Sequence, residues 1–112
     1  MASQITSGTQ TCTVTTEHSL ASTTTAGTYQ LRIDLNAAVE GTTPDRFRVA
    51  WKTKTLTGST ARYEGSQEIE GAQYLDCWVS EPVCIVHYLE FLLTQTTGTS
   101  RNVDWSLIRV DA

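Results

Sequence analysis

The sequence predicts an all-β protein: a single antiparallel β-sandwich or jelly-roll-like domain of about seven strands. Three observations support this prediction. Ser and Thr fill about a quarter of the 112 positions, and β-branched Thr suits a pleated, half-exposed surface. Several short segments alternate apolar and polar residues, as a strand does when one face is buried. Glycine- and proline-containing stretches separate these segments, and the chain length is that of one domain.

The N-terminal part begins with a polar segment, residues 1–10, which we expect to form a flexible arm ahead of a sandwich domain at residues 11–112. Thr11–Glu17 alternates and is the first predicted strand. A polar loop follows and ends at Gly27. The clearest strand is Tyr29–Asn36, in which every second side chain is large and apolar.

The middle of the chain predicts a hairpin. Ala37–Asp45 contains Gly and Pro and is expected to be a connection. Arg46–Thr55 alternates and places Phe47, Val49 and Trp51 inward. Thr60–Ile69 returns as the second strand of the hairpin after a turn at Gly58.

The C-terminal third predicts three more strands. Gln73–Val79 is the first candidate, and Glu81-Pro82 ends it because proline cannot donate to a strand ladder. The apolar residues of Val83–Thr94 fit the periodicity of a helix as well as that of a strand, but the Val, Ile, Tyr and Phe content of the segment favours a strand. Asn102–Val110 alternates again, and the glycine-containing loop before it predicts a terminal hairpin with Val83–Thr94.

The charge pattern argues against nucleic acid as a partner, since the net charge is −4. Four basic residues share one face of a predicted strand: Arg46, Arg48, Lys52 and Lys54. A solvated strand face is the favoured interpretation, and a phosphate or acidic-surface contact is the alternative. The sequence has neither the pattern of a signal peptide nor an apolar run long enough to span a membrane.

The three cysteines predict buried thiols rather than a disulfide framework, because their number is odd. A bond between Cys77 and Cys84 across a turn is the alternative. Cys77, Cys84, His87 and Glu90 lie close in sequence, but their spacing matches no common metal site. We therefore expect no metal and no cofactor.

Catalytic patterns are not evident in the sequence. No serine lies in a Gly-x-Ser-x-Gly turn, and the glycines stand singly, so no phosphate-binding loop is predicted. The chain is expected not to be an enzyme. Trp51 and Trp105 occupy inward-facing positions of their predicted alternating strands and are expected to lie in the core, whereas Trp78 is expected to be partly exposed. An exposed Trp can anchor a protein interface or stack on a sugar ring.

Four segments of the chain resemble a group of small accessory proteins of tailed bacteriophages, similar to the cement or decoration proteins that coat phage heads. The segments are GTYQLRIDL (27–35), VEG (39–41), KTLTGSTAR (54–62) and LLTQTTGTSRNVDWSL (92–107). This resemblance covers about Gly27–Val110 and contains no diagnostic motif. It implies an all-β virion protein made in the bacterial cytoplasm and located on the phage head. It also implies that the major capsid protein is the partner and that the chain self-associates, with a trimer favoured.

Two functional hypotheses follow. The first is a decoration protein that bridges capsid subunits, with the Gln4–Gln10 arm ordering on a neighbour; a frayed terminus without a role is the alternative for that arm. The second is a carbohydrate- or receptor-binding module of a phage tail or neck. The coat protein of a small RNA phage is a weaker option, because those coats end in helices. The candidate contact residues are Gln4, Ile5, Thr6, Thr9, Gln10 and Trp78.

Overall fold

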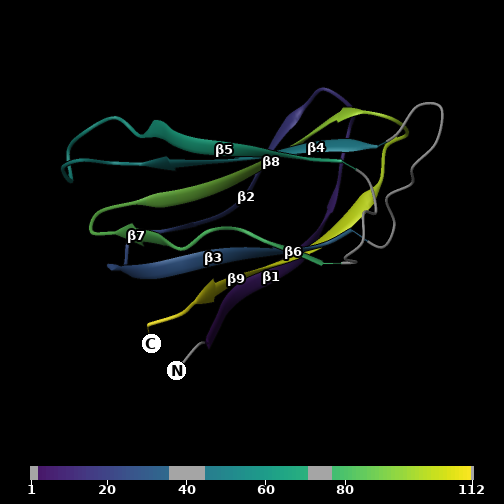
Figure 1. Cartoon of the computed structure of the whole chain (residues 1–112). Coiled ribbons are helices and arrows are strands. Elements are labelled where there is room, and N and C mark those ends of the chain that lie inside the picture. Colours follow the sequence, from purple (N-terminus) through teal and green to yellow (C-terminus); the bar gives the residue numbers. More distant parts are fainter. Residues whose placement is uncertain (1–2, 36–44, 71–76, 112) are drawn as a thin grey trace.

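The computed structural model describes residues 3–35, 45–70 and 77–111, and these residues form two antiparallel β-sheets packed face to face (Figure 1). The all-β sandwich predicted from the sequence is confirmed. The described residues contain no helix of the length and apolar character needed to cross a bilayer. Their nine strands are β1 (Ser3–Thr11), β2 (Glu17–Thr23), β3 (Gly27–Asp34), β4 (Arg46–Thr53), β5 (Arg62–Glu70), β6 (Cys77–Val79), β7 (Val83–Ile85), β8 (Leu89–Thr97) and β9 (Asn102–Arg109).

The two sheets use strands from both ends of the chain. Sheet A has the order β1-β9-β3-β6, and β7 also pairs with β3. Sheet B has the order β2-β8-β4-β5. The N- and C-terminal strands are neighbours in sheet A, where Ser3 pairs with Arg109, and Figure 1 shows both termini at the same corner.

The core lies between the sheets and follows the predicted alternation. Tyr29, Leu31 and Ile33 of β3 are at most 1% exposed. Phe47, Val49 and Trp51 of β4 face them from sheet B and are at most 4% exposed, as the sequence predicted. Strict period-two patterning was informative here because each strand buries one face. The predicted hairpin is also confirmed, since β4 pairs antiparallel with β5.

The N-terminal segment differs from the prediction. Residues 3–11, expected to be mostly a free arm, form β1 and pair with β9 from Ser3 to Thr11. β1 is exposed along almost its whole length, so it lacks the apolar period that marks a half-buried strand. Backbone pairing rather than side-chain burial holds it in sheet A. The predicted first strand at Thr11–Glu17 is instead mainly the connection between β1 and β2.

The predicted terminal hairpin is wrong. Val83–Thr94 contains two strands, β7 and β8, which belong to different sheets, and β8 and β9 also lie in different sheets. The loop between β8 and β9 therefore crosses from one layer to the other. A glycine-containing turn is compatible with both a hairpin and a crossover, so the local sequence does not distinguish them.

A buried polar cluster fixes this crossover. The Asp45 side chain is 1% exposed; its carboxylate accepts a hydrogen bond from the Thr99 N–H (3.0 Å) and pairs with the Arg101 Nε (2.8 Å). The Gln95 amide, fully buried, donates to the Thr99 carbonyl (2.7 Å) and accepts from the Arg101 N–H (3.1 Å). Gly98 has a φ of +96°, a conformation that favours glycine. The loop is thus anchored to sheet B, through Asp45 before β4 and Gln95 of β8, at the point where the chain leaves that sheet.

Each sheet also contains a tryptophan that covers a glycine on an edge strand. In sheet B the Trp51 ring lies against Gly65, where an added Cβ would be 2.5 Å from Cζ2. In sheet A the Trp105 ring lies against Gly8, where an added Cβ would be 3.2 Å from Cζ2. The glycine leaves room for the ring, so at these two positions the edge strand contributes no side chain to the core, although β5 contributes the buried Ile69 further along.

β8 is buried on both faces, which explains why its periodicity was ambiguous. Phe91 and Leu93 face the core, while Leu92, on the outer face, is only 6% exposed. On that outer face the Tyr63 hydroxyl donates to the Glu17 carboxylate (2.6 Å), joining β5 and β2, the two edges of sheet B. This contact raises the pKa of Tyr63, because the carboxylate stabilises the protonated phenol.

The three cysteines are free thiols, one buried and two exposed. Cys12 is fully buried, as predicted, and burial raises the pKa of its thiol to about 11. Cys77 and Cys84 are exposed, so the prediction of buried thiols is wrong for them. They pair with Asp34 and Thr28 of β3, six residues apart, which separates them by about 20 Å. This distance excludes an intramolecular Cys77–Cys84 bond in the folded chain.

We therefore expect two thiols per native chain to react with a maleimide at pH 8, and the third to react only after denaturation. Cys12 is shielded and its thiolate is disfavoured, whereas the other two are accessible. Mass spectrometry of the labelled chain measures the number and position of the adducts. Rapid labelling of Cys12 in the native Cys77→Ser/Cys84→Ser variant would contradict this expectation.

Candidate functional site

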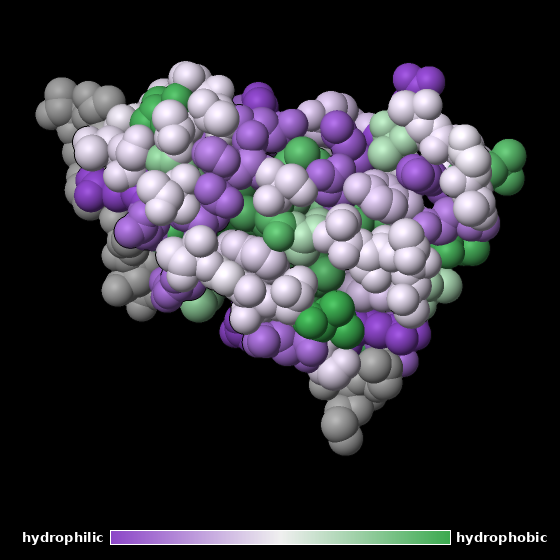
Figure 2. Space-filling model, turned by 180° about the vertical axis from the view of Figure 1, so that it is seen from behind, coloured by the Kyte–Doolittle hydropathy of each residue, from purple (hydrophilic) through white to green (hydrophobic). Residues whose placement is uncertain are grey.

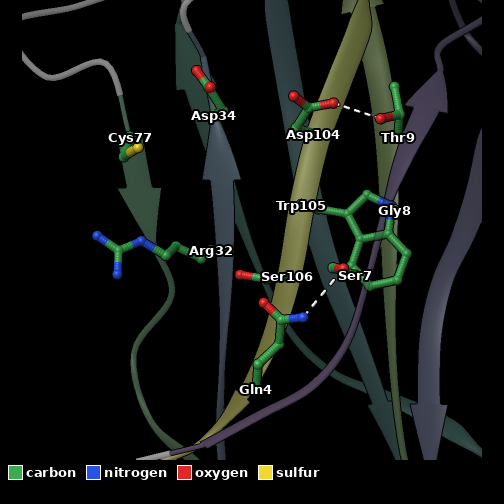
Figure 3. Close-up of a pocket in the computed structure, with 10 residues that line it drawn as sticks. All are labelled: Gln4, Ser7, Gly8, Thr9, Arg32, Asp34, Cys77, Asp104, Trp105 and Ser106. Atoms are coloured by element: carbon green, nitrogen blue, oxygen red, sulfur yellow. Dashed lines mark hydrogen bonds between the residues drawn. The ribbon is translucent and has the colours of Figure 1, made fainter.

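The candidate site is a groove of about 400 Å³ on the outer face of sheet A (Figure 3). Four neighbouring strands, β1, β9, β3 and β6, contribute to it. Its lining residues are Gln4, Ser7, Gly8, Thr9, Arg32, Asp34, Cys77, Asp104, Trp105 and Ser106.

The strand register explains why these residues meet. Ser7 of β1 is opposite Ser106 of β9, which is opposite Arg32 of β3. One step along the sheet, Thr9 is opposite Asp104, and Asp34 is opposite Cys77. Side chains two residues apart point to the same face of a strand, so these two rows form one outer surface.

The groove carries hydroxyl, amide and charged groups on a fixed frame. The Thr9 hydroxyl donates to the Asp104 carboxylate (2.5 Å), and the Gln4 amide donates to the Ser7 hydroxyl (3.3 Å). Arg32 is exposed and makes no hydrogen bond or ion pair with another side chain in the described part of the chain. Figure 3 shows its guanidinium extending away from β9. It is therefore available to a carboxylate or carbonyl of a partner.

A second hollow lies on the outer face of sheet B, but the polar side chains around it make hydrogen bonds and cation–π contacts with one another. Tyr63 donates to Glu17, and Lys52 Nζ lies 4.6 Å from the Tyr63 ring centroid. Ser19 donates to Glu90 (2.6 Å) on the same face. These contacts satisfy the side chains within the protein, so the sheet A groove is the better candidate for a ligand or partner.

The predicted basic stripe lies on this outer face of sheet B. Arg48 is opposite Glu68, and Lys52 is opposite Glu90. Carboxylates thus alternate with the basic side chains across the strands. This arrangement agrees with a solvated strand face rather than with a phosphate site.

Only part of the predicted contact set reaches the groove. Gln4 and Thr9 line it. Ile5 is at the β-bulge of β1 and is 46% exposed, while Thr6 and Gln10 are opposite the buried residues Leu107 and Val103 and so lie on the inward side. Trp78 is half-buried, which agrees with its predicted partial exposure. It packs against the core and does not line the groove.

The groove residues that sequence reasoning missed are the polar positions of β3 and β9: Arg32, Asp34, Asp104 and Ser106. Their alternation with apolar residues showed that they face solvent. The sequence did not reveal that β9 pairs with both β1 and β3. This pairing brings three distant segments side by side.

Metal-binding residues are dispersed in the described ranges, where no group of three or more His, Cys, Asp or Glu could hold a metal ion. His87 shares a hydrogen bond between its Nδ1 and the Thr57 hydroxyl (3.1 Å), and His18 Nε2 accepts from the Thr13 N–H (3.2 Å). Both imidazoles therefore organise loops at the ends of strands.

The molecular surface is predominantly polar on the face drawn in Figure 2, where hydrophobic residues form small, separate areas. Comparison of the chain with protein-family models, with curated proteins and with solved structures finds no match.

Proposed function

We propose that the protein is a virion structural protein of the capsid-decoration type, which binds major capsid protein subunits through the outer face of sheet A. It acts by adhesion and not by catalysis. In this proposal it is made in the bacterial cytoplasm and ends on the surface of the phage head. The proposal combines the sequence resemblance with the geometry of the groove.

The observation that carries the proposal is the exposed Arg32 in an open, polar groove on a rigid sheet. Four strands fix the backbone positions of its polar residues, so little backbone conformational entropy is lost when they bind. Arg32 lies in the same groove as the Asp104 carboxylate, which gives the surface both signs of charge. Such mixed charge favours a partner with a defined complementary surface over a simple anion or cation.

The open shape of the groove also favours a protein partner. Small-molecule sites are usually deep, mostly apolar pockets that enclose the ligand. This groove is lined mainly by hydroxyl, amide and charged side chains from adjacent strands. A protruding loop of a capsid subunit could place carbonyl and carboxylate groups on it.

The test is co-sedimentation of the chain with undecorated phage capsids. The native chain should bind saturably, and Arg32→Glu should weaken binding by about tenfold, because a central charged contact is replaced by repulsion. Arg62→Glu, on the exposed edge strand β5 of the other sheet, is the matched control and should bind normally.

Failure of the native chain to bind capsids would refute the proposed function. Equal weakening by the Arg32 and Arg62 variants would instead indicate a non-specific charge effect and refute the groove as the contact.

A carbohydrate- or receptor-binding module is the less favoured function. Its main support was Trp78, but that side chain packs against the core and does not line the groove. Trp105 lines the groove, but its ring lies against Gly8. An aromatic surface on which a sugar ring could stack therefore has little support.

A further inference from the structure

The edge strand β1 differs from the other strands at the edges of the two sheets. It is nine residues long, forms one edge of sheet A and is exposed from Ser3 to Thr9. The sequence SQITSGTQT contains no charged residue, no histidine and no proline. Only the irregular register between Gln4 and Thr6 interrupts it.

The remaining edges carry features that prevent strand addition. β5 has charged residues at Arg62, Glu64 and Glu68, and β2 begins with Glu17. β6 and β7, on the opposite side of sheet A, are three residues each. Charges and short length are common protections against edge-to-edge pairing. Because β1 lacks both, it is the edge best suited to pair with another strand.

We infer that β1 pairs antiparallel with β1 of a second copy of this chain, so that two molecules join their A sheets into one continuous sheet. A second copy is the partner that fits best because β1 carries no charge that would repel its own duplicate. Thr, Ser and Gln side chains facing one another across two strands form favourable polar pairs.

The regular part of β1, Thr6–Thr11, sets the geometry of the pair. In an antiparallel pair of identical strands, even-numbered residues must be opposite even-numbered ones, and odd-numbered residues opposite odd-numbered ones. Only then do the core-facing side chains of both copies lie on the same side of the joined sheet. A two-fold axis at Gly8 satisfies this condition and places Ser7 opposite Thr9 of the second copy. Gly8 has no side chain, so the two residues that meet at the axis add no bulk to either face of the sheet.

This dimer has a functional consequence. The two-fold axis is perpendicular to the sheet, so the outer faces of both A sheets lie on the same side. The two grooves, each lined by β1 residues, would form one extended surface. Two linked sites bind a repeating partner more tightly than one site does.

Multi-angle light scattering of the purified chain tests the inference, at concentrations from micromolar to sub-millimolar. The native chain should have twice its 12.3 kDa mass. Ser7→Lys and Ser7→Glu should each raise the dimer Kd several-fold, because like charges meet near the axis. An equimolar mixture of the two variants should restore the dimer, since opposite charges then face each other.

Ser66→Lys is the matched control, because Ser66 is an exposed serine on the edge strand β5 and should leave the dimer intact. A native chain that is monomeric or trimeric overturns the inference, as does a mixture that stays monomeric. The measurement needs no capsid, so a monomer that still binds capsids would refute the dimer and leave the proposed function standing.

Discussion

Replacing Asp45 with alanine should lower the free energy of unfolding by about 3 kcal/mol, the largest effect that we expect from a single substitution. The carboxylate is 1% exposed, pairs with Arg101 and accepts the Thr99 N–H. Its removal leaves the Thr99 N–H without this acceptor and the Arg101 guanidinium without its counter-ion. Urea unfolding followed by circular dichroism measures the change.

Asp104→Ala is the control for this experiment. Asp104 is exposed and accepts one hydrogen bond from Thr9, so its loss should cost less than about 1 kcal/mol. Equal effects at Asp45 and Asp104 would show that the buried cluster does not anchor the crossover between β8 and β9.

Gly65→Ala should destabilise the protein by about 2 kcal/mol, because the new methyl group overlaps the Trp51 ring. The Cβ position lies 2.5 Å from Cζ2 and 2.7 Å from Cε2 of that ring. Trp51 is 4% exposed and packs against Phe91 with ring centroids 6.0 Å apart, so it has little room to move.

Gly58→Ala is the matched control, since an added Cβ at that position has no atom within 4 Å. It should leave stability unchanged or raise it slightly, because alanine restricts the unfolded chain. Thermal unfolding of the two variants gives the comparison. An unchanged melting temperature for Gly65→Ala would mean that the Trp51 ring can shift at no cost.

The local part of the fold could be predicted from the sequence. β3, β4 and the β4–β5 hairpin each bury one face, and their alternation is visible without any knowledge of their partners. β1 was missed as a strand because side-chain burial contributes little to it, and β8 was ambiguous because both its faces are covered. Burial on one face is the condition under which periodicity identifies a strand.

The non-local part could not be predicted. The loop at residues 98–101 has the composition of a hairpin turn, but it binds Asp45, more than fifty positions earlier, at the point where the chain leaves sheet B for sheet A. The groove, like this loop, depends on contacts between segments that are far apart in the sequence. The sequence predicted Arg32 as a polar strand residue and Gln4 and Thr9 as polar residues of an N-terminal arm, but their proximity depends on β9, which lies between β1 and β3.

The pairing of β1 with β9 has a consequence for synthesis on the ribosome. Ser3 is opposite Arg109, so β1 leaves the exit tunnel long before β9 and must wait for that strand before it can join sheet A. Sheet B needs only residues 17–97 and can be completed earlier. During this interval the nascent chain carries β1 as an unpaired, uncharged segment. Closure of sheet A is therefore the late, long-range step of folding, at which neighbouring nascent chains could exchange strands.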